Sequence, residues 1–368
     1  MRQKPKTRPA SRRRRHPAVV TIHDVAARAG VSVATVSRVL NRKAPVKEET
    51  SRQVLEIARL LRYVPNVAAR SLSSRRSHAI GIVLPDVHGE FFSEVIRGID
   101  VAARRAGYHI LVSGSHSDPG ELLEVVDAMR GRVDGLIVMS PEDTANTVRE
   151  QLPRALPLVL LNAHADGYDT VTIDNYGGAH AMVQHLASLG HTRIAFISGP
   201  MELASARTRR QALLSSLKRK GLASDKSLIE IGNHRIDGGR AAMERLLALE
   251  DLPTAVIASN DLTAIGAIGA LHRHNLRVPE DVSVVGFDDI EISAFLHPAL
   301  TTVRLSRAAI ADRAFQALHR SGKREANTPA VEYKIRPELI VRNSTAPVSS
   351  KRTGITLLKG AGDRPLHK

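Results

Sequence analysis

Apolar residues near the start of the chain recur at the spacing of an amphipathic helix. They occupy positions i, i+3, i+4 and i+7 and are Ile22, Val25, Ala26 and Ala29. Gly30 stands where this helix would end, and Val31 is an apolar plug beneath the turn. Ser32 is a natural N-cap for a second helix, because its hydroxyl can accept an otherwise unpaired backbone N–H. The pattern predicts two short helices joined by a tight turn.

The second predicted helix has an apolar side and an outer side. Its inward positions are Val36, Val39 and Leu40. The positions left on the outer face or near its N-terminal end are Val33, Ala34, Ser37 and Arg38. This is the geometry in which a recognition helix offers its first turns to base edges in the major groove of DNA. The pattern predicts a helix-turn-helix, and its alternative is two ordinary amphipathic helices in a globular core.

A third helix is predicted over residues 46–62. Its apolar stripe consists of Val46, Val54, Leu55, Ala58 and Leu61. Pro65 stops it, because the residue before a proline is pushed out of the helical region. Residues 66–72 are good helix formers, but a helix so short is marginal in water and would fold only when something supports it. Residues 73–78 are polar and basic and are typical of a linker.

From residue 79 onward, apolar runs of strand length alternate with amphipathic helices. The predicted strands are 79–84, 108–112, 135–139, 158–161, 170–173, 193–198, 255–258 and 282–286, and predicted helices include 92–106, 121–130, 177–189 and 208–220. This alternation predicts parallel sheets covered by helices on both faces. About 265 residues exceed one doubly wound sheet, so two lobes are expected. Residues 345–368 are polar and predict a flexible tail.

Positive charge is concentrated beside the predicted helix-turn-helix. Residues 1–77 hold 19 Lys and Arg against 4 Asp and Glu, whereas the remaining 291 residues hold 34 against 33. This asymmetry is the electrostatic footprint of phosphate binding, so the expected partner is double-stranded DNA. Residues 1–19 are rich in Arg, Lys and Pro and predict a disordered arm. The arm either adds nonspecific or minor-groove contacts with DNA or is a mere extension.

Composition excludes several classes of protein. The chain has no cysteine, which excludes a disulfide framework, a thiolate metal site and a cysteine nucleophile. No apolar run reaches the roughly 18 residues of a transmembrane helix, and no apolar segment of a secretory signal follows the basic start. We therefore expect a cytoplasmic protein. The sequence shows no nucleophile elbow, zinc-protease motif or P-loop, which predicts neither an enzyme nor a cofactor or metal site.

Several motifs follow one another at a characteristic spacing. They are Thr21–Ala26 with Gly30–Asn41, Tyr63–Asn66 with Ala69–Leu72, Ile80–Asp86 followed by Phe91 and Phe92, Gly190–Ile194, Ser259–Asp261 and Val278–Asp289. Over about residues 20–345 the chain resembles the LacI/GalR family of bacterial transcription regulators. The resemblance implies an all-α helix-turn-helix head with a hinge helix. It also implies an α/β core of two lobes with parallel sheets, like periplasmic sugar-binding proteins.

The resemblance also implies an organisation along the chain and a set of partners. The expected segments are a basic arm (1–19), a DNA-binding domain (20–65), a hinge helix and linker (66–78), a two-lobed effector-binding and dimerisation domain (79–344) and a tail (345–368). The expected partners are a pseudo-palindromic operator, a small effector such as a sugar, and a second copy of the chain, with a tetramer as an alternative. No membrane partner is expected.

For DNA, the resemblance assigns base reading to Val33, Ala34 and Arg38. The chemistry agrees, because Arg38 can make a bidentate contact with guanine while Val33 and Ala34 offer apolar contacts, for instance to a thymine methyl. This recognition helix is similar to that of galactose-type regulators. Residues 66–72 match the hinge helix, and Leu72 matches a leucine wedged into the minor groove; its alternative is an ordinary core leucine. Further DNA-binding candidates are Thr35, Ser37, Asn66 and Ala69.

For the effector, the resemblance implies six residues in a cleft between the lobes. They are Phe91 and Phe92, one of which stacks on the ligand; Asn162 at the cleft edge; Arg209, which clamps the ligand; and Asn260 and Asp288, which hold hydroxyls. This set suits a sugar, because acceptors and a planar donor fork fix several hydroxyls at once. As alternatives, Asp288 caps a loop and Arg209 lies on a solvated helix face. The aromatic residue that the family often has after Arg209 is missing.

The sequence therefore predicts a transcriptional repressor that a small molecule controls. Three other functions compete with this interpretation. They are a solute-binding protein for transport, a sugar-processing enzyme with a DNA-binding head, and a regulator whose effector pocket is vestigial. The basic head argues against the first, and the missing catalytic motifs argue against the second.

Overall fold

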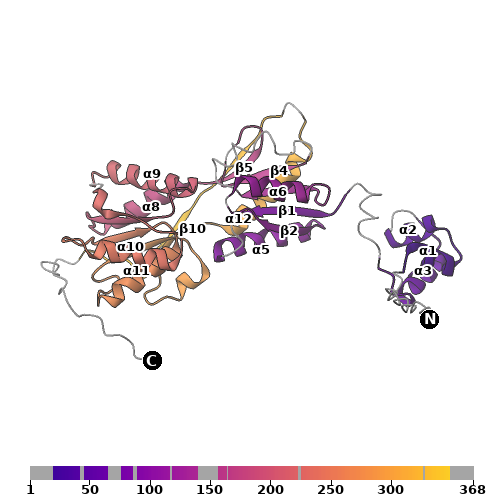
Figure 1. The fold of residues 1–368 in the computed structure, drawn as a ribbon, viewed down its shortest axis with the longest axis horizontal. Helices are drawn as coiled ribbons and strands as arrows, with labels where there is room; N and C mark the ends of the chain where they lie inside the picture. Colours follow the sequence, from indigo (N-terminus) through magenta and orange to yellow (C-terminus); the bar gives the residue numbers. More distant parts are fainter. Residues whose placement is uncertain are drawn as a thin grey trace, which may run out of the picture. The chain divides into compact units, whose positions relative to one another are not determined.

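The computed structural model of the chain describes residues 20–41, 45–64, 76–85, 89–116, 118–139, 156–163, 165–222, 225–325 and 328–348. The chain divides into two compact units, Met1–Ser77 and His78–Lys368 (Figure 1). We call them the head and the core domain. The predicted basic arm, the predicted hinge helix and most of the predicted tail lie outside the described residues.

The head is built from α1 (Ile22–Ala29), α2 (Val33–Asn41) and α3 (Glu48–Leu60). Gly30 ends α1 with a positive φ of 63°, which glycine adopts without steric cost. The Ser32 hydroxyl accepts the Thr35 N–H at 3.1 Å and so caps α2. The three helices share a small core made of Val25, Ala26, Ala29, Val36, Val39, Val54 and Ala58. This arrangement confirms the predicted helix-turn-helix.

The third helix differs from its prediction in length and in one core residue. It spans Glu48–Leu60 instead of 46–62. The Leu55 side chain, which was expected to be buried, is 52% exposed. Val54 and Ala58 face the core as predicted, and Leu61 packs against it together with Ile57, which the prediction left out. Those four residues follow the i, i+3, i+4, i+7 rule, and Leu55 is turned about 100° from Val54.

The first lobe of the core domain is a six-stranded parallel sheet. Its strand order is β11-β5-β4-β3-β1-β2, with β1 (Ala79–Leu84), β2 (His109–Gly114), β3 (Gly135–Met139), β4 (Leu158–Leu161), β5 (Asp169–Ile173) and β11 (Glu332–Ile335). In this register Ile82 lies between Val112 and Ile137. One face packs on α5 (Glu90–Arg105) and α12 (Arg307–Ser321), and the other face packs on α6 (Pro119–Met129).

The second lobe has a six-stranded sheet of order β12-β10-β9-β8-β6-β7. Its strands are β6 (Ile194–Ser198), β7 (Ile229–Ile231), β8 (Ala255–Ala258), β9 (Ser283–Asp288), β10 (Thr301–Arg304) and β12 (Glu338–Ile340). All neighbouring pairs are parallel except β10 and β12. One face packs on α8 (Asn175–Ser188) and α9 (Ala204–Arg219), and the other on α10 (Ile236–Leu247) and α11 (Asp261–Arg273).

The chain passes between the two lobes three times. The crossovers lie after β5, after β10 and after β11, near residues 174, 305 and 336. The Asp174 N–H donates to the Ile335 carbonyl at 3.0 Å, which ties the first crossover to the third. Because of the second crossover, α12 returns to the first lobe, where it packs beside α5 (Figure 1). Each lobe is therefore assembled from segments far apart in the sequence.

The predicted tail begins later than residue 345. The Ser344 side chain is fully buried, and its hydroxyl accepts the Thr301 N–H at 2.8 Å and donates to the Val284 carbonyl at 2.6 Å. The Ala346 N–H donates to the Ser283 hydroxyl, and the Val348 N–H donates to the Leu189 carbonyl. Residues 345–348 are thus part of the second lobe. They are held there by hydrogen bonds to backbone and hydroxyl groups of that lobe.

Candidate functional site

The recognition helix exposes the residues expected to meet DNA to different degrees. Ala34 and Arg38 are exposed, whereas Val33, Thr35 and Ser37 are half-buried. Val33 packs against the core of the head, and the Thr35 hydroxyl lies 2.9 Å from the Ser32 hydroxyl. Arg38 and Ala34 are therefore the most accessible of the five candidates. The other three DNA-binding candidates, Asn66, Ala69 and Leu72, lie outside the described residues.

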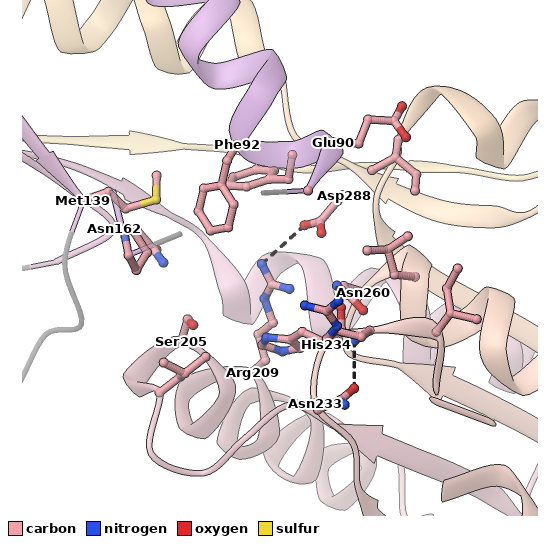
Figure 2. Close-up of a pocket in the computed structure, with 18 of the residues that line it drawn as sticks. Glu90, Phe92, Met139, Asn162, Ser205, Arg209, Asn233, His234, Asn260 and Asp288 are labelled. Carbon is pink, nitrogen blue, oxygen red and sulfur yellow. Dashed lines mark hydrogen bonds and ion pairs between the residues drawn. The ribbon is translucent and has the colours of Figure 1, made fainter. Parts of the chain in front are cut away.

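A cavity of about 1140 Å³ lies between the two lobes of the core domain (Figure 2). All six residues predicted to bind an effector line it, and they are Phe91, Phe92, Asn162, Arg209, Asn260 and Asp288. The first lobe contributes a largely apolar wall and the second lobe a largely polar one. The structure thus brings the six candidates together around one cavity that is large enough for a small molecule.

Arg209 is held by contacts on all sides of its guanidinium group. The Nε–H donates to Asn175 Oδ1 at 3.1 Å, and Nη1 donates to the Ser259 carbonyl at 2.6 Å. Nη2 lies 3.5 Å from Asp288 Oδ1, and the group stacks on the Phe287 ring with 3.9 Å between Cζ and the ring centroid. Burial lowers the pKa of Arg209, and the nearby Asp288 carboxylate opposes that shift. The alternative of a solvated helix face is wrong.

Asp288 ends β9 with an uncommon backbone conformation. Its φ is +110°, and only 7% of the residue is exposed. Burial raises its pKa from 3.8 to about 6, while Arg209 and Arg307 act in the opposite direction. A residue held in such a conformation is typical of a binding site. The Asp288 carboxylate faces the Arg209 guanidinium, and both residues line the cavity (Figure 2).

A second carboxyl group, that of Asp261, lies behind Asp288. It is buried and accepts hydrogen bonds from the Ile290 N–H at 2.9 Å, from the Ser293 hydroxyl at 2.7 Å and from the Thr302 hydroxyl. Burial and the Asp288 charge raise its pKa to about 7. Its three donors come from β10 and from the loop after β9, so Asp261 fixes the loop that follows Asp288.

Asn260 caps helix α11 and organises a neighbouring loop. Its Oδ1 accepts the Thr263 N–H at 2.9 Å, and its Nδ2 donates to the His234 carbonyl at 3.0 Å. The side chain still lines the cavity. An amide has two donor hydrogens and two acceptor lone pairs, so these two bonds leave capacity for a ligand.

His234 lines the cavity, although no motif or periodicity singled it out. Its φ is +61°, and burial, followed by the nearby Arg209 charge, lowers its pKa to about 4. Its Nε2 is buried and has no hydrogen-bond partner among the described residues. The ring is therefore neutral at physiological pH. It follows β7, a strand of three residues that hydrophobic patterning did not predict, and this is why it was missed.

The first-lobe wall is formed by the start of α5 and by strand ends. Phe91 and Phe92 meet edge to face, with 5.5 Å between ring centroids and 73° between ring planes. Phe92 and Met139 point toward the space in front of Arg209 (Figure 2). Glu90, at the start of the same helix, accepts a hydrogen bond from the Glu291 N–H of the second lobe. This contact joins the two lobes at the rim of the cavity.

Asn162 follows the end of β4 and lines the first-lobe side of the cavity. Asn162 has a φ of +52°, and its N–H donates to the Val171 carbonyl at 2.7 Å.

Among the described residues, no group of three His, Cys, Asp or Glu side chains is placed to hold a metal ion. The described helices are all too short or too polar to span a membrane.

Comparison with known proteins agrees with this geometry. Residues 21–66 match the family described as bacterial regulatory proteins, lacI family, and residues 183–345 match the periplasmic binding protein-like domain. The HTH-type transcriptional repressor PurR of Mannheimia succiniciproducens is 33% identical over 341 residues, which cover 90% of this chain and 100% of that protein. The chain belongs to the lacI family of bacterial regulatory proteins.

Two further relatives support this assignment. The HTH-type transcriptional repressor CytR of Escherichia coli K12 is 36% identical over 304 residues, which cover 81% of this chain and 88% of that protein. The crystal structure of the Lac repressor dimer bound to operator and the anti-inducer ONPF has a TM-score of 0.82 at 28% identity, covering 89% and 99% of the two chains. This member of the lacI family is a DNA-binding transcriptional repressor under small-molecule control, which confirms the predicted family, fold and function.

Proposed function

We propose that the effector of this repressor is a neutral molecule rich in hydroxyl groups, such as a sugar or a glycoside, and that it binds between the lobes. The observation that carries the proposal is the charge balance of the cavity. Its described lining holds three arginines and three carboxylates, which are Arg209, Arg235, Arg240, Glu90, Asp237 and Asp288. A cavity with no excess charge and a histidine that burial keeps neutral favours an uncharged ligand.

The two walls suit the two kinds of surface that a sugar carries. Asp288, Asn260 and Arg209 offer acceptors and donors at fixed positions for hydroxyl groups. Phe91 and Phe92 offer apolar rings for the C–H face of a pyranose. We infer that the second lobe orients the effector and the first lobe covers it.

The effector acts on DNA binding by changing how far the lobes close. The three crossovers and the contact between Glu90 and Glu291 are the links that such a motion would alter. Coupling between two sites in one protein is typically 1–3 kcal/mol, which changes DNA affinity about 5- to 150-fold. In this proposal the protein performs no chemistry on the effector, needs no cofactor and acts in the cytoplasm at the nucleoid.

The head reads the operator through the exposed side of α2. Arg38 makes a bidentate contact with guanine, and Val33 and Ala34 touch thymine methyl groups, with Thr35 and Ser37 beside them. Asn66, Ala69 and Leu72, which lie outside the described residues, are proposed to contact DNA as well, with Leu72 in the minor groove. Exposure of Ala34 and Arg38 supports the first part of this proposal.

A pseudo-palindromic operator requires two heads, and the core domain offers apolar surface for a second copy. On the first lobe, Leu111 and Val112 of the edge strand β2 are 42% and 40% exposed, beside Val101 of α5. On the second lobe, Phe295 is 69% exposed and follows Ile292. Large apolar side chains exposed in clusters mark interaction surfaces. We propose that these two clusters lie in the interface of a homodimer, from which a tetramer can form as a dimer of dimers.

Thermal unfolding of the full-length protein against a compound panel tests the effector proposal. The panel holds neutral sugars, alkyl glycosides, polyols, phosphorylated sugars and purines. We expect a dose-dependent rise in Tm with a neutral sugar or glycoside, since a ligand that binds the folded state stabilises it. A rise with anionic compounds alone would contradict the neutral ligand, and turnover of the bound compound would contradict the absence of enzymatic activity.

The DNA proposal is tested by selecting operators from genomic fragments and measuring their affinity for two arginine variants. Arg38→Ala should lower specific affinity about 5- to 150-fold per half-site, because a bidentate contact is worth about 1–3 kcal/mol. Arg28→Ala removes an equally exposed charge from α1 and is the matched control. It should weaken specific and nonspecific binding alike. Equal effects of the two variants on specificity would exclude Arg38 as a base-reading residue.

A further inference from the structure

One partner of the Arg209 side chain, Asn175, comes from a helix and not from a strand end of the second-lobe sheet. Ser259, Phe287 and Asp288 lie at the ends of β8 and β9, in the centre of the second-lobe sheet. Asn175, which accepts the Nε–H at 3.1 Å, is the first residue of α8. It lies two residues beyond β5, where the chain has just crossed from the first lobe. The direction of the guanidinium group is thus set partly by a residue of the crossover.

Asn175 is an unusual residue for its place in α8. It is 7% exposed, and the other buried residues of that helix are small or apolar, namely Gly178, Ala179, Met182, Val183 and Leu186. A buried amide costs free energy unless it is hydrogen-bonded. Its bonded partner is the Arg209 side chain, which lines the cavity. The polarity of this position is explained by Arg209 and not by the packing of α8.

The backbone of Asn175 is held by contacts that reach the first lobe. The preceding residue, Asp174, caps α8 by accepting the Gly177 N–H at 3.1 Å. Its N–H donates to the Ile335 carbonyl, and its carboxylate lies 3.4 Å from Lys334 Nζ, both on β11 of the first lobe. These contacts fix the start of α8, from which the Asn175 amide oxygen accepts the Nε–H.

A neutral acceptor at Nε also fits the charges around the group. Asp288 already supplies one carboxylate at Nη2, and burial raises the pKa of that carboxyl. A second carboxylate at Nε would be another buried charge beside it. The amide satisfies the Nε–H without adding charge. Each outer nitrogen carries two hydrogens, so beside its contact with Ser259 or Asp288 it keeps one N–H for a ligand.

We propose that Asn175 is a positioning residue of the effector pocket, which holds the Arg209 guanidinium in its binding direction from the first interlobe crossover. This rests on the proposed function only in that Arg209 contacts the effector. Asn175 itself does not touch the ligand. It acts by fixing Arg209 before the ligand arrives, so that less conformational freedom is lost on binding.

The test observes Arg209 directly in the full-length protein without any small molecule. In ¹⁵N spectra the Arg209 Nε–H resonance is assigned by its disappearance in Arg209→Lys. We expect slow hydrogen exchange at this group in the wild type and exchange about tenfold faster in Asn175→Ala, because the acceptor is gone. Tyr176→Ala, which alters the next and exposed residue of α8, is the matched control and should leave exchange unchanged.

A second variant separates positioning from a general loss of packing. Asn175→Asp keeps an oxygen at the same place, so slow exchange should be restored, and the charged acceptor should move the Hε resonance downfield. An unmoved Hε resonance in Asn175→Asp, or unchanged exchange in folded Asn175→Ala, would overturn the proposal. Since no ligand is present, failure of the sugar panel would leave this result standing, and the two proposals fail separately.

Discussion

The two lobes of the core domain share one topology but give the cavity opposite walls. Numbered within each lobe, both sheets have the strand order 6-5-4-3-1-2, and they differ in that the last strand is antiparallel in the second lobe. The first-lobe wall presents Phe91, Phe92 and Met139, whereas the second-lobe wall presents Arg209 and Asp288. The fold thus fixes where a ligand binds, and the residues after the strand ends fix how each wall binds it.

The difference between the walls has an energetic meaning. Apolar rings contribute contact area, which tolerates small displacements of a ligand. A buried ion pair with hydrogen bonds on every edge is directional, and removing one partner leaves the other as an unpaired buried charge. We therefore expect substitutions in the second-lobe wall to lower effector affinity and stability more than substitutions in the first-lobe wall.

The largest effect is expected from Arg209→Ala. The effector concentration that is needed for a given rise in Tm should increase at least about 100-fold, since the charged contact of Arg209 with the ligand is lost. The free energy of unfolding should drop by about 3 kcal/mol, because Asp288 is left buried without its partner. Thermal unfolding with and without the effector measures both. Arg210→Ala, one position along α9, is the control, and an equal loss in that variant would refute the special role of Arg209.

Removing the C-terminal residues that bond to the second lobe should destabilise that lobe and leave the first lobe unchanged. A stop after Asn343 removes Ser344 and the bonds of residues 345–348 to the second lobe, which should cost about 3 kcal/mol because buried Thr301 and Val284 groups lose their partner. A stop after Val348 keeps those bonds and is the control. Hydrogen exchange should rise in the second-lobe sheet and not in the first, and equal exchange in both sheets would contradict this assignment.

A smaller effect is expected from the apolar wall. Phe92→Ala removes a ring that faces the space in front of Arg209, so effector affinity should fall about tenfold, equivalent to about 1.4 kcal/mol. Phe92→Leu should recover most of the loss, because area matters here more than geometry. Isothermal titration with the effector from the panel gives both values. A loss as large as that of Arg209→Ala would reverse the comparison between the walls.

The smallest effect is a dependence of stability on pH that arises in the second lobe. The folded pKa values of Asp261 and Asp288 are raised to about 7 and about 6, so the folded state binds more protons than the unfolded state between pH 3.8 and these values. Their contribution to stability therefore falls as pH rises through that window. His234, with its pKa lowered from 6.5 to about 4, acts oppositely and loses stability as pH falls from 6.5 to 4.

Above pH 6.5 most of the His234 contribution is present, and the titration of Asp261 dominates. We expect the free energy of unfolding to fall by about 1 kcal/mol over the next pH unit. Urea unfolding in small pH steps measures this slope. The variant Asp261→Asn should flatten it, and a slope that stays the same in that variant would assign the effect to other groups.

The sequence predicted strands best where they are apolar throughout. Both ends of β3 were predicted correctly because all five residues are apolar or small, as expected for a parallel strand buried on both faces. In contrast, β11 (Glu332–Ile335) contains Glu332 and Lys334 and is largely exposed, so patterning gave no signal. The short strand β7 gave none either, and with it the position of His234 was lost.

The six effector candidates came from motifs and not from periodicity. Arg209 lies among several arginines of α9, and patterning alone could not choose between it and Arg210. The choice depends on partners from distant segments, such as Asn175 and Asp288, which only the folded chain brings together. Leu55 shows the opposite failure, since an apolar residue placed in the predicted stripe is exposed.

The three crossovers have a consequence for the order in which the protein is made. The first lobe needs α12 and β11, so its sheet is incomplete until residue 335 has been synthesised, and the second lobe waits for residues 338–348. The helices of the head, by contrast, end at Leu60. Synthesis proceeds at roughly 5 to 20 residues per second. The three helices of the head are therefore present for tens of seconds before the sheet of either lobe is complete. The helix-turn-helix is therefore complete before the lobes that hold the effector cavity.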